Sequence, residues 1–153
     1  IDRSPLQLRR AETRVLQRGY DNVELLCGEV DDREVRHRVG EGADAVFATR
    51  VLHHAASPRV TMAALAALLR PGGELVVIDY QPHEDEVFRE QRADVWMGFA
   101  ADELRQLATL VGLSGAAWFE VPKGFVGGGI DGHLPWQVLR AMRPTATPPT
   151  SRG

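Results

Sequence analysis

Apolar residues recur at helical spacing near the start of the chain and again past its middle. Ser4 and Pro5 suit the N-cap and the first position of a helix, and Gly19 suits its left-handed C-cap. The clearest pattern runs from Leu104 to Val111, with apolar residues at i, i+3, i+4 and i+7. These patterns predict helices over residues 5–18, 58–69, 83–97 and 101–111.

Short apolar runs between the helices predict strands over residues 23–27, 43–48, 75–79 and 116–121. Residues 134–142 fit either a strand or a short helix, and residues 31–42 indicate a charged loop with a weak helical turn. The continuous hydrophobicity of 43–48 is typical of a strand buried on both faces, and residues 70–73 (Arg-Pro-Gly-Gly) form a strong breaker. Because strands alternate with helices, we expect a parallel α/β sheet whose ligands bind beyond the carboxyl ends of its strands.

Composition narrows the classes of function. Of the 153 residues, 18 are Lys or Arg and 21 are Asp or Glu, which leaves a net charge of -3. Without a strong positive field we expect no direct nucleic-acid binding by this chain. Cys27 is the only cysteine, so no disulfide or multi-cysteine metal site can form within the chain, and we expect a reducing, cytoplasmic location. No apolar run approaches the ~18 residues of a membrane-spanning helix, so we expect no membrane association.

Two short segments near the N-terminus could bind a nucleoside. Asp2 lies between an apolar residue and the start of a helix, and an acidic group at such a position can hold both hydroxyls of a ribose. Gly28-Glu29-Val30 directly follows an apolar run, so Glu29 could accept a hydrogen bond from an exocyclic amine while Val30 packs on a ring. A solvated carboxylate and an exposed turn are the alternative interpretations.

His53 and His54 follow the predicted strand 43–48 by a few residues, and His83 follows the next strand. Imidazole suits a general base or a hydrogen bond to substrate, so these three histidines are the candidate catalytic residues. Adjacent histidines on a helix point apart, and neither a carboxylate nor a cysteine is close in sequence. We therefore expect no metal site, and one of the two adjacent histidines to be only a packed or exposed residue.

Gly127-x-Gly129-x-x-Gly132 matches the dinucleotide-binding fingerprint formally, but its context argues against that function. No helix start and no acidic residue follows it, so we expect a loop before the last strand. A nicotinamide-dependent dehydrogenase is also disfavoured, because Lys123 is the only lysine and neither tyrosine lies near it in sequence.

Taken together, these segments resemble the class I S-adenosylmethionine-dependent methyltransferases from Ile1 to about Arg143. The most recognisable stretch is residues 69–75 (Leu-Arg-Pro-Gly-Gly-Glu-Leu), and the segments around Asp2, Gly28 and His53 come in the family's order. The stretch from Trp96 to Leu104 is similar to a subgroup often fused to a winged-helix repressor domain. The resemblance divides the chain into residues 1–143, the C-terminal part of a methyltransferase domain, and residues 144–153, a disordered tail.

The resemblance implies an α/β fold: a Rossmann-like methyltransferase sheet with helices on both faces, N-terminally truncated because the family's first strand and glycine-rich loop would precede Ile1. An incomplete sheet or an upstream domain offers a route to a dimer. The implied activity is methyl transfer from S-adenosylmethionine to a small-molecule acceptor. The alternative is a module that senses S-adenosylmethionine or S-adenosylhomocysteine within a transcriptional regulator. The resemblance assigns cofactor binding to Asp2, Arg3, Gly28, Glu29, Val30 and Thr49.

Overall fold

The computed structural model describes residues 1–145, so the predicted tail lies almost wholly outside the described residues. The chain forms two compact units, an N-terminal unit (Ile1–Gly40) and a C-terminal unit (Glu41–Gly153).

In the N-terminal unit, helix α1 (Pro5–Arg18) confirms the predicted helix and its caps. The Ser4 hydroxyl accepts a hydrogen bond from the backbone N–H of Gln7, and Gly19 has the left-handed φ of 65°. Helix α2 (Arg33–Val39) replaces most of the predicted charged loop, and its Val35 is buried. Local capping signals therefore located α1, whereas the apolar contact that holds α2 is a tertiary one.

The predicted strand over 23–27 is wrong. Only Cys27 pairs there, in a single parallel bridge with Asp2. A strand is held by a ladder of hydrogen bonds to a partner, and among the described residues this segment has one partner residue rather than a run of them.

The C-terminal unit is built on a four-stranded sheet in the order β1-β2-β4-β3. Its strands are β1 (Ala43–Thr49), β2 (Leu69–Tyr80), β3 (Ser114–Glu120) and β4 (Trp136–Met142). β1 and β2 are parallel, but β4 runs antiparallel to both of its neighbours. The sheet is thus mixed rather than parallel throughout, and the ambiguous segment 134–142 is a strand.

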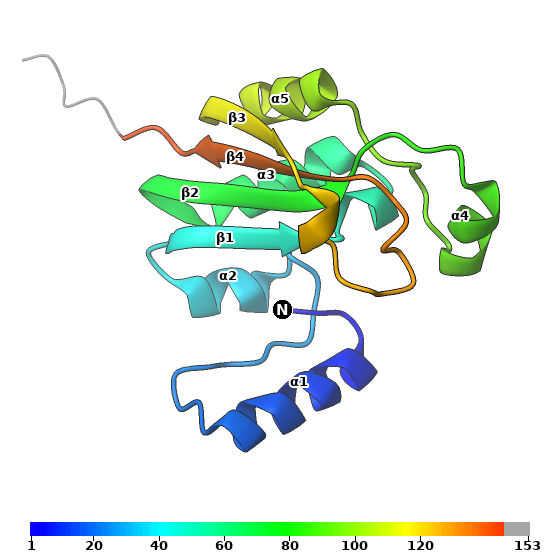
Figure 1. Ribbon diagram of the computed structural model, residues 1–153. Coiled ribbons are helices and arrows are strands. Elements are labelled where there is room, and N and C mark those ends of the chain that lie inside the picture. Colours follow the sequence, from blue (N-terminus) through cyan, green and yellow to red (C-terminus); the bar gives the residue numbers. More distant parts are fainter. Residues whose placement is uncertain (146–153) are drawn as a thin grey trace, which may run out of the picture. The chain divides into compact units, whose positions relative to one another are not determined.

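Helices α3 (Pro58–Ala67) and α5 (Ala101–Leu110) lie against one face of this sheet (Figure 1). The sheet presents alternate residues to them, and Leu75, Val77, Leu139 and Ala141 are completely or almost completely buried. Burying a large aliphatic side chain contributes about 1.5–3 kcal/mol, so these residues hold the core together. They also fix where the carboxyl ends of β1 and β2 lie.

Strand β1 is an edge of the described sheet, and its exposed residues show that the expectation of burial on both faces is wrong. Its Phe47 is 70% exposed, and Ala48 is its one buried residue. The Pro-Gly-Gly breaker does follow the end of α3, but it lies inside β2 as an irregularity. Pairing jumps from Ala43–Leu69 to Ala45–Glu74, which accommodates the extra residues as a bulge.

The segment after β2 contains only a short helix, α4 (Glu86–Arg92), instead of a helix over 83–97. α4 ends because Ala93 adopts a left-handed φ of 55°. The chain then returns to the sheet, where the N–H of Phe99 donates to the carbonyl of Tyr80 (3.1 Å). The N–H groups of Val95 and Trp96 both donate to the carbonyl of His53, which lies on the 3-10 turn η1 (Leu52–His54) after β1.

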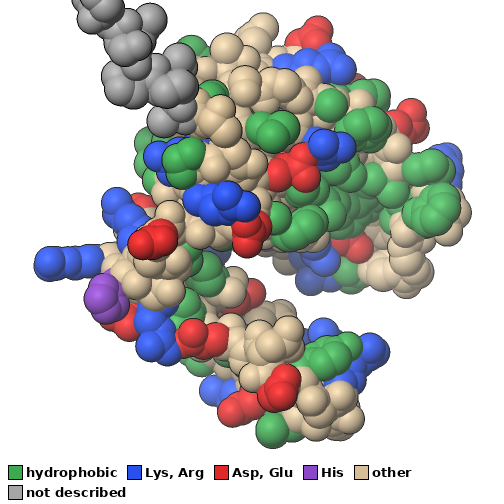
Figure 2. Space-filling model, turned by 90° about the vertical axis from the view of Figure 1, so that its left-hand side faces the viewer, with side chains coloured by type: hydrophobic (Ala, Val, Ile, Leu, Met, Phe, Trp, Pro, Cys, Tyr) green, Lys and Arg blue, Asp and Glu red, His purple; other side chains and the backbone are tan. Residues whose placement is uncertain are grey.

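On the surface that Figure 2 shows, acidic and basic side chains are interspersed rather than gathered by sign. Within residues 1–145, no helix has the length and apolar character needed to cross a bilayer.

Candidate functional site

In the N-terminal unit, the bridge between Asp2 and Cys27 brings the two predicted cofactor-binding segments side by side. The N–H of Asp2 donates to the carbonyl of Leu26 (3.1 Å), and the N–H of Gly28 donates to the carbonyl of Asp2 (3.2 Å). The Asp2 side chain is exposed, and its Oδ1 accepts from the N–H of Ser4 at 2.7 Å. Asp2 is therefore held at the start of α1, next to the turn that carries Glu29.

The Gly28 turn is shaped by Asp32. Asp32 Oδ2 accepts from the N–H of Glu29 (2.8 Å), and a Cβ on residue 28 would lie 2.5 Å from that oxygen. A side chain at residue 28 would therefore displace the Asp32 carboxylate from its hydrogen bond to Glu29. The Glu29 carboxylate lies 3.7 Å from the Arg3 guanidinium in a solvent-exposed pair, and Val30 is half-buried. Four of the predicted cofactor residues, Asp2, Arg3, Gly28 and Glu29, are thereby brought together.

In the C-terminal unit, the polar residues gather at the carboxyl ends of β1 and β2, where an α/β sheet usually binds its ligand. The centre of this cluster is Asp79, which is completely buried. Its Oδ2 accepts from the N–H of Leu52 (3.0 Å) and its Oδ1 from the N–H of Tyr80 (2.8 Å). Asp79 thus ties the turn η1 to the end of β2.

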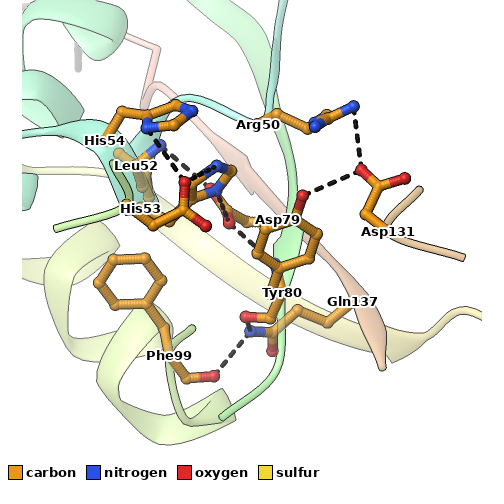
Figure 3. Close-up of polar contacts among 10 residues, drawn as sticks. Arg50, Leu52, His53, His54, Asp79, Tyr80, Phe99, Asp131 and Gln137 are labelled. Atoms are coloured by element: carbon orange, nitrogen blue, oxygen red, sulfur yellow. Dashed lines mark hydrogen bonds and ion pairs between the residues drawn. The ribbon is translucent and has the colours of Figure 1, made fainter. Parts of the chain in front are cut away.

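His53 is the third partner of Asp79, with its Nδ1 2.7 Å from Asp79 Oδ1 (Figure 3). Both oxygens of Asp79 already accept backbone hydrogen bonds, so Nδ1 of His53 is the donor and carries the proton. The ring is 1% exposed and stacks on Tyr80 with centroids 4.5 Å apart. His53 is therefore enclosed and has no surface from which to act on a bound acceptor.

The expectation that the two adjacent histidines point apart is wrong. Nε2 of His53 and Nδ1 of His54 lie 3.8 Å and 3.3 Å from Oδ1 of Asp94, and the two ring centroids are 4.2 Å apart. They lie on a single 3-10 turn rather than within an α-helix, and the N–H groups after Asp94 bind the carbonyl of His53. These backbone hydrogen bonds hold the Asp94 carboxylate close to both imidazole rings.

Tyr80 connects His53, on which its ring stacks, to a second polar group formed by Asp131 and Arg50. Its hydroxyl donates to Oδ2 of Asp131 (3.0 Å), which also receives the guanidinium of Arg50 (2.9 Å). Burial, and then the hydrogen bond to Asp131, raises the pKa of Tyr80 well above its ordinary value. The phenol therefore stays protonated and acts as a donor. Arg50 follows β1 directly and holds a left-handed φ of 61°, which is strained for a residue with a Cβ.

Gln137 anchors the opposite side of the cluster. Its amide nitrogen donates to the carbonyls of Tyr80 and Phe99, each at 2.7 Å, and its oxygen accepts from the Trp118 indole. Gln137 thus uses its donors and its acceptor in a fully buried position.

His83 is half-buried, and its ring lies edge-on to Tyr80. Burial lowers the pKa of His83, so the neutral imidazole predominates. Nδ1 accepts from the N–H of Asp85 (3.3 Å), which leaves the proton on Nε2. Nε2 is buried and has no hydrogen-bond partner among the described residues, and Nδ1 is already an acceptor, so His83 is poorly placed to act as a base.

Thr49 is exposed at the end of β1, next to Arg50. The loop with Gly127, Gly129 and Gly132 precedes β4, as expected, and the N–H of Gly132 donates to the carbonyl of Gly129 in a tight turn. Sequence reasoning missed Asp94, Asp131, Arg50 and Gln137. Each contacts partners dozens of residues away in sequence. The one local signal that could have indicated a site residue was the position of Arg50, directly after a buried-strand pattern.

Comparison with known proteins agrees with this geometry. Residues 1–75 match the model of a family described as "Methyltransferase domain". No curated protein matches the sequence.

Solved structures match almost the whole chain. A Bacillus halodurans C-125 protein described as a methyltransferase is 16% identical with a TM-score of 0.68, over 94% of this chain and 81% of that one. The fold is that of the Rossmann-like methyltransferases. A Haemonchus contortus phosphoethanolamine N-methyltransferase, solved with S-adenosylhomocysteine, is 14% identical with a TM-score of 0.70, over 94% of this chain and 43% of that one.

The same methyltransferase fold also carries other chemistry. The [4+2]-cyclase SpnF is 17% identical with a TM-score of 0.71, and the match covers 94% of this chain and 64% of that one. The fold therefore establishes the architecture, and the reaction has to be argued from the site.

Proposed function

We propose that the protein binds S-adenosylmethionine and transfers its methyl group to a small-molecule acceptor. The observation that carries the proposal is the bridge between Asp2 and Cys27, which sets an exposed carboxylate beside a glycine turn. The family match over residues 1–75 covers this whole arrangement and adds support.

The residues present fit the cofactor. Both ribose hydroxyls are donors, and the exposed carboxylate of Asp2 is an acceptor-only group beside them in the proposed complex. Glu29 supplies a second carboxylate for an exocyclic amine, and its pair with Arg3 is exposed enough to open. Gly28, where a side chain would clash, keeps this turn narrow.

When bound, the cofactor supplies an electrophilic methyl group on a sulfonium. The chain then has to orient the acceptor, which supplies much of the rate in a transfer of this kind. A general base is needed only when the methyl-accepting atom of the substrate has to lose a proton. His53 is enclosed and Nε2 of His83 is buried without a hydrogen-bond partner among the described residues, which leaves His54, 34% exposed, as the candidate base.

The test is titration calorimetry on the full-length protein, including any residues that precede Ile1, with S-adenosylmethionine and S-adenosylhomocysteine. Asp2→Ala should lose about 1–3 kcal/mol of binding free energy, because the hydroxyls lose their acceptor. Asp21→Ala, at the other end of α1 and also exposed, should leave the affinity unchanged.

No binding of either compound by the full-length protein would contradict the proposal. Tight binding of S-adenosylhomocysteine without transfer to any nucleophile would instead favour the sensing module of a transcriptional regulator.

A further inference from the structure

His53, His54 and Asp94 form a compact cluster of metal-ligand atoms that the proposed methyl transfer does not use as a unit. One ligand atom from each residue lies within 4.8 Å of the other two. Two imidazole nitrogens thus face one carboxylate at the carboxyl end of β1, beneath the turn η1.

Asp94 is a buried carboxylate whose nearest polar groups are the two imidazole rings. Its side chain is 1% exposed, and neither carboxylate oxygen receives a hydrogen bond from the described residues. Asp85 shows the ordinary alternative, because its Oδ1 accepts from the N–H of Phe88 and its Oδ2 pairs with His133. A buried carboxylate without donors is costly, so Asp94 calls for a positive partner between the two rings.

His53 is held so that it presents a lone pair to that carboxylate. Its Nδ1–H donates to Asp79, which leaves Nε2 as an acceptor facing Oδ1 of Asp94. Two acceptors facing each other repel unless a cation lies between them. A carboxylate behind the far nitrogen is the usual support for a metal-bound histidine, since it fixes the tautomer and strengthens the ligand.

The separations suit a shared ion better than direct hydrogen bonds. His53 Nε2 is 3.8 Å and His54 Nδ1 is 3.3 Å from Asp94 Oδ1, beyond the usual N–H···O range of about 2.7–3.2 Å. Ligands at about 2.0–2.2 Å from one tetrahedral ion lie roughly 3.3–3.6 Å apart. Small side-chain shifts would close the site around an ion.

We propose that His53, His54 and Asp94 bind one divalent transition-metal ion of the zinc class. Two imidazoles and one carboxylate suit Zn²⁺, Co²⁺ or Fe²⁺, whereas Mg²⁺ and Ca²⁺ prefer oxygen ligands throughout. Three protein ligands leave a coordination position open, and His54 is the ligand that reaches solvent. The proposal is independent of the cofactor, because metal binding is measured without it.

The test is Zn²⁺ binding by the full-length protein after chelator treatment. Metal analysis of the desalted protein should give one equivalent, and Co²⁺ should produce the visible absorption of a low-symmetry site. Asp94→Asn keeps the size of the side chain and should weaken Zn²⁺ binding at least 100-fold in competition with a chelator. His54→Ala should do the same.

His133→Ala is the matched control, since His133 forms an exposed pair with Asp85 outside the cluster and its loss should leave the affinity unchanged. Circular dichroism of each variant confirms that the protein is folded. Folded wild type that takes up no Zn²⁺ overturns the proposal and points to a proton on His53 as the compensating charge. Equal Zn²⁺ affinity in Asp94→Asn and wild type also overturns it, by locating the ion on other histidines.

Discussion

The hydroxyl of Tyr80 donates to the carboxylate of Asp131 at 3.0 Å, and so ties the end of β2 to the loop before β4. Asp131 is itself held by Arg50 from the end of β1. One carboxylate therefore connects three segments that are far apart in sequence, all at the edge where the polar cluster lies.

Removing that hydroxyl should loosen the connection. Tyr80→Phe keeps the ring that stacks on His53 but leaves Asp131 with Arg50 alone, so unfolding should cost about 1–3 kcal/mol less. Chemical denaturation at pH 7 measures the change. A loss below about 0.3 kcal/mol would show that water replaces the phenol at no cost.

The same phenol should make stability fall at high pH. Because the folded protein has the raised pKa, only the unfolded chain releases this proton above pH ~10, and stability decreases as pH rises past that value. Denaturation between pH 8 and 11 should show a steeper decline for wild type than for Tyr80→Phe. Parallel profiles would mean that Tyr80 ionises as easily in the fold as outside it.

His83 should produce the opposite trend at mildly acidic pH. Its pKa is lowered by burial, so as pH falls below ~6.5 the unfolded chain takes up the proton first and the folded state loses stability. His83→Gln should flatten the stability profile between pH 7.5 and 5. His37→Gln, which replaces an exposed histidine on α2, should keep the wild-type slope.

Substitution by alanine should destabilise the protein to very different extents at two glycines that have nearly the same backbone φ. Gly98 and Gly112 have φ of 81° and 82°, but a Cβ at 98 would lie 2.1 Å from the carbonyl oxygen of Gln81, and one at 112 would meet nothing within 4 Å. Gly112→Ala should cost about 1–2 kcal/mol from backbone strain alone. Gly98→Ala should cost clearly more and displace Phe99, as thermal unfolding would show. Equal losses would mean that the chain relaxes freely at 98.

Gln137 should be intolerant of apolar replacement. Gln137→Met leaves the carbonyl of Phe99 and the Trp118 indole N–H without their Gln137 partner, and the carbonyl of Tyr80 keeps only the N–H of Phe99, which should cost about 2–4 kcal/mol in urea denaturation. Arg140→Gln, on the same strand, removes only a partly exposed pair with Glu74 and should cost less than about 1 kcal/mol. A tolerated methionine would imply that water enters beside Tyr80.

Elements with strong local signals were predictable from the sequence. α1 has its cap residues next to it, and α5 has an unbroken apolar stripe, so both were located within a residue or so. The apolar segment 23–27 failed because a strand depends on a partner that the pattern does not specify. The helix expected over 83–97 failed because Ala93, an excellent helix former, turns left-handed to send the chain back to β2.

The site followed the same division. Asp2 and the Gly28 turn could be singled out because each has a distinctive neighbourhood in sequence; the structure sets them side by side, and their cofactor role stays a prediction. Asp94 could not be found in this way. It is 40 residues from His54 and lies in no motif, and its importance comes only from being buried beneath two rings. The burial of the Asp94 carboxylate arises only from tertiary packing, so no local sequence pattern indicates it.

Strand β4 runs against β2, so Trp136 at its start pairs with Tyr80 at the end of β2. The connection over residues 121–135 consequently emerges above the same sheet edge as the histidine turn. Insertions or deletions in this connection would leave the β3–β4 ladder in register while altering what surrounds the histidine turn. Proteins sharing this scaffold could thus vary the surface over this sheet edge by changing one hairpin, with the histidines and the sheet untouched.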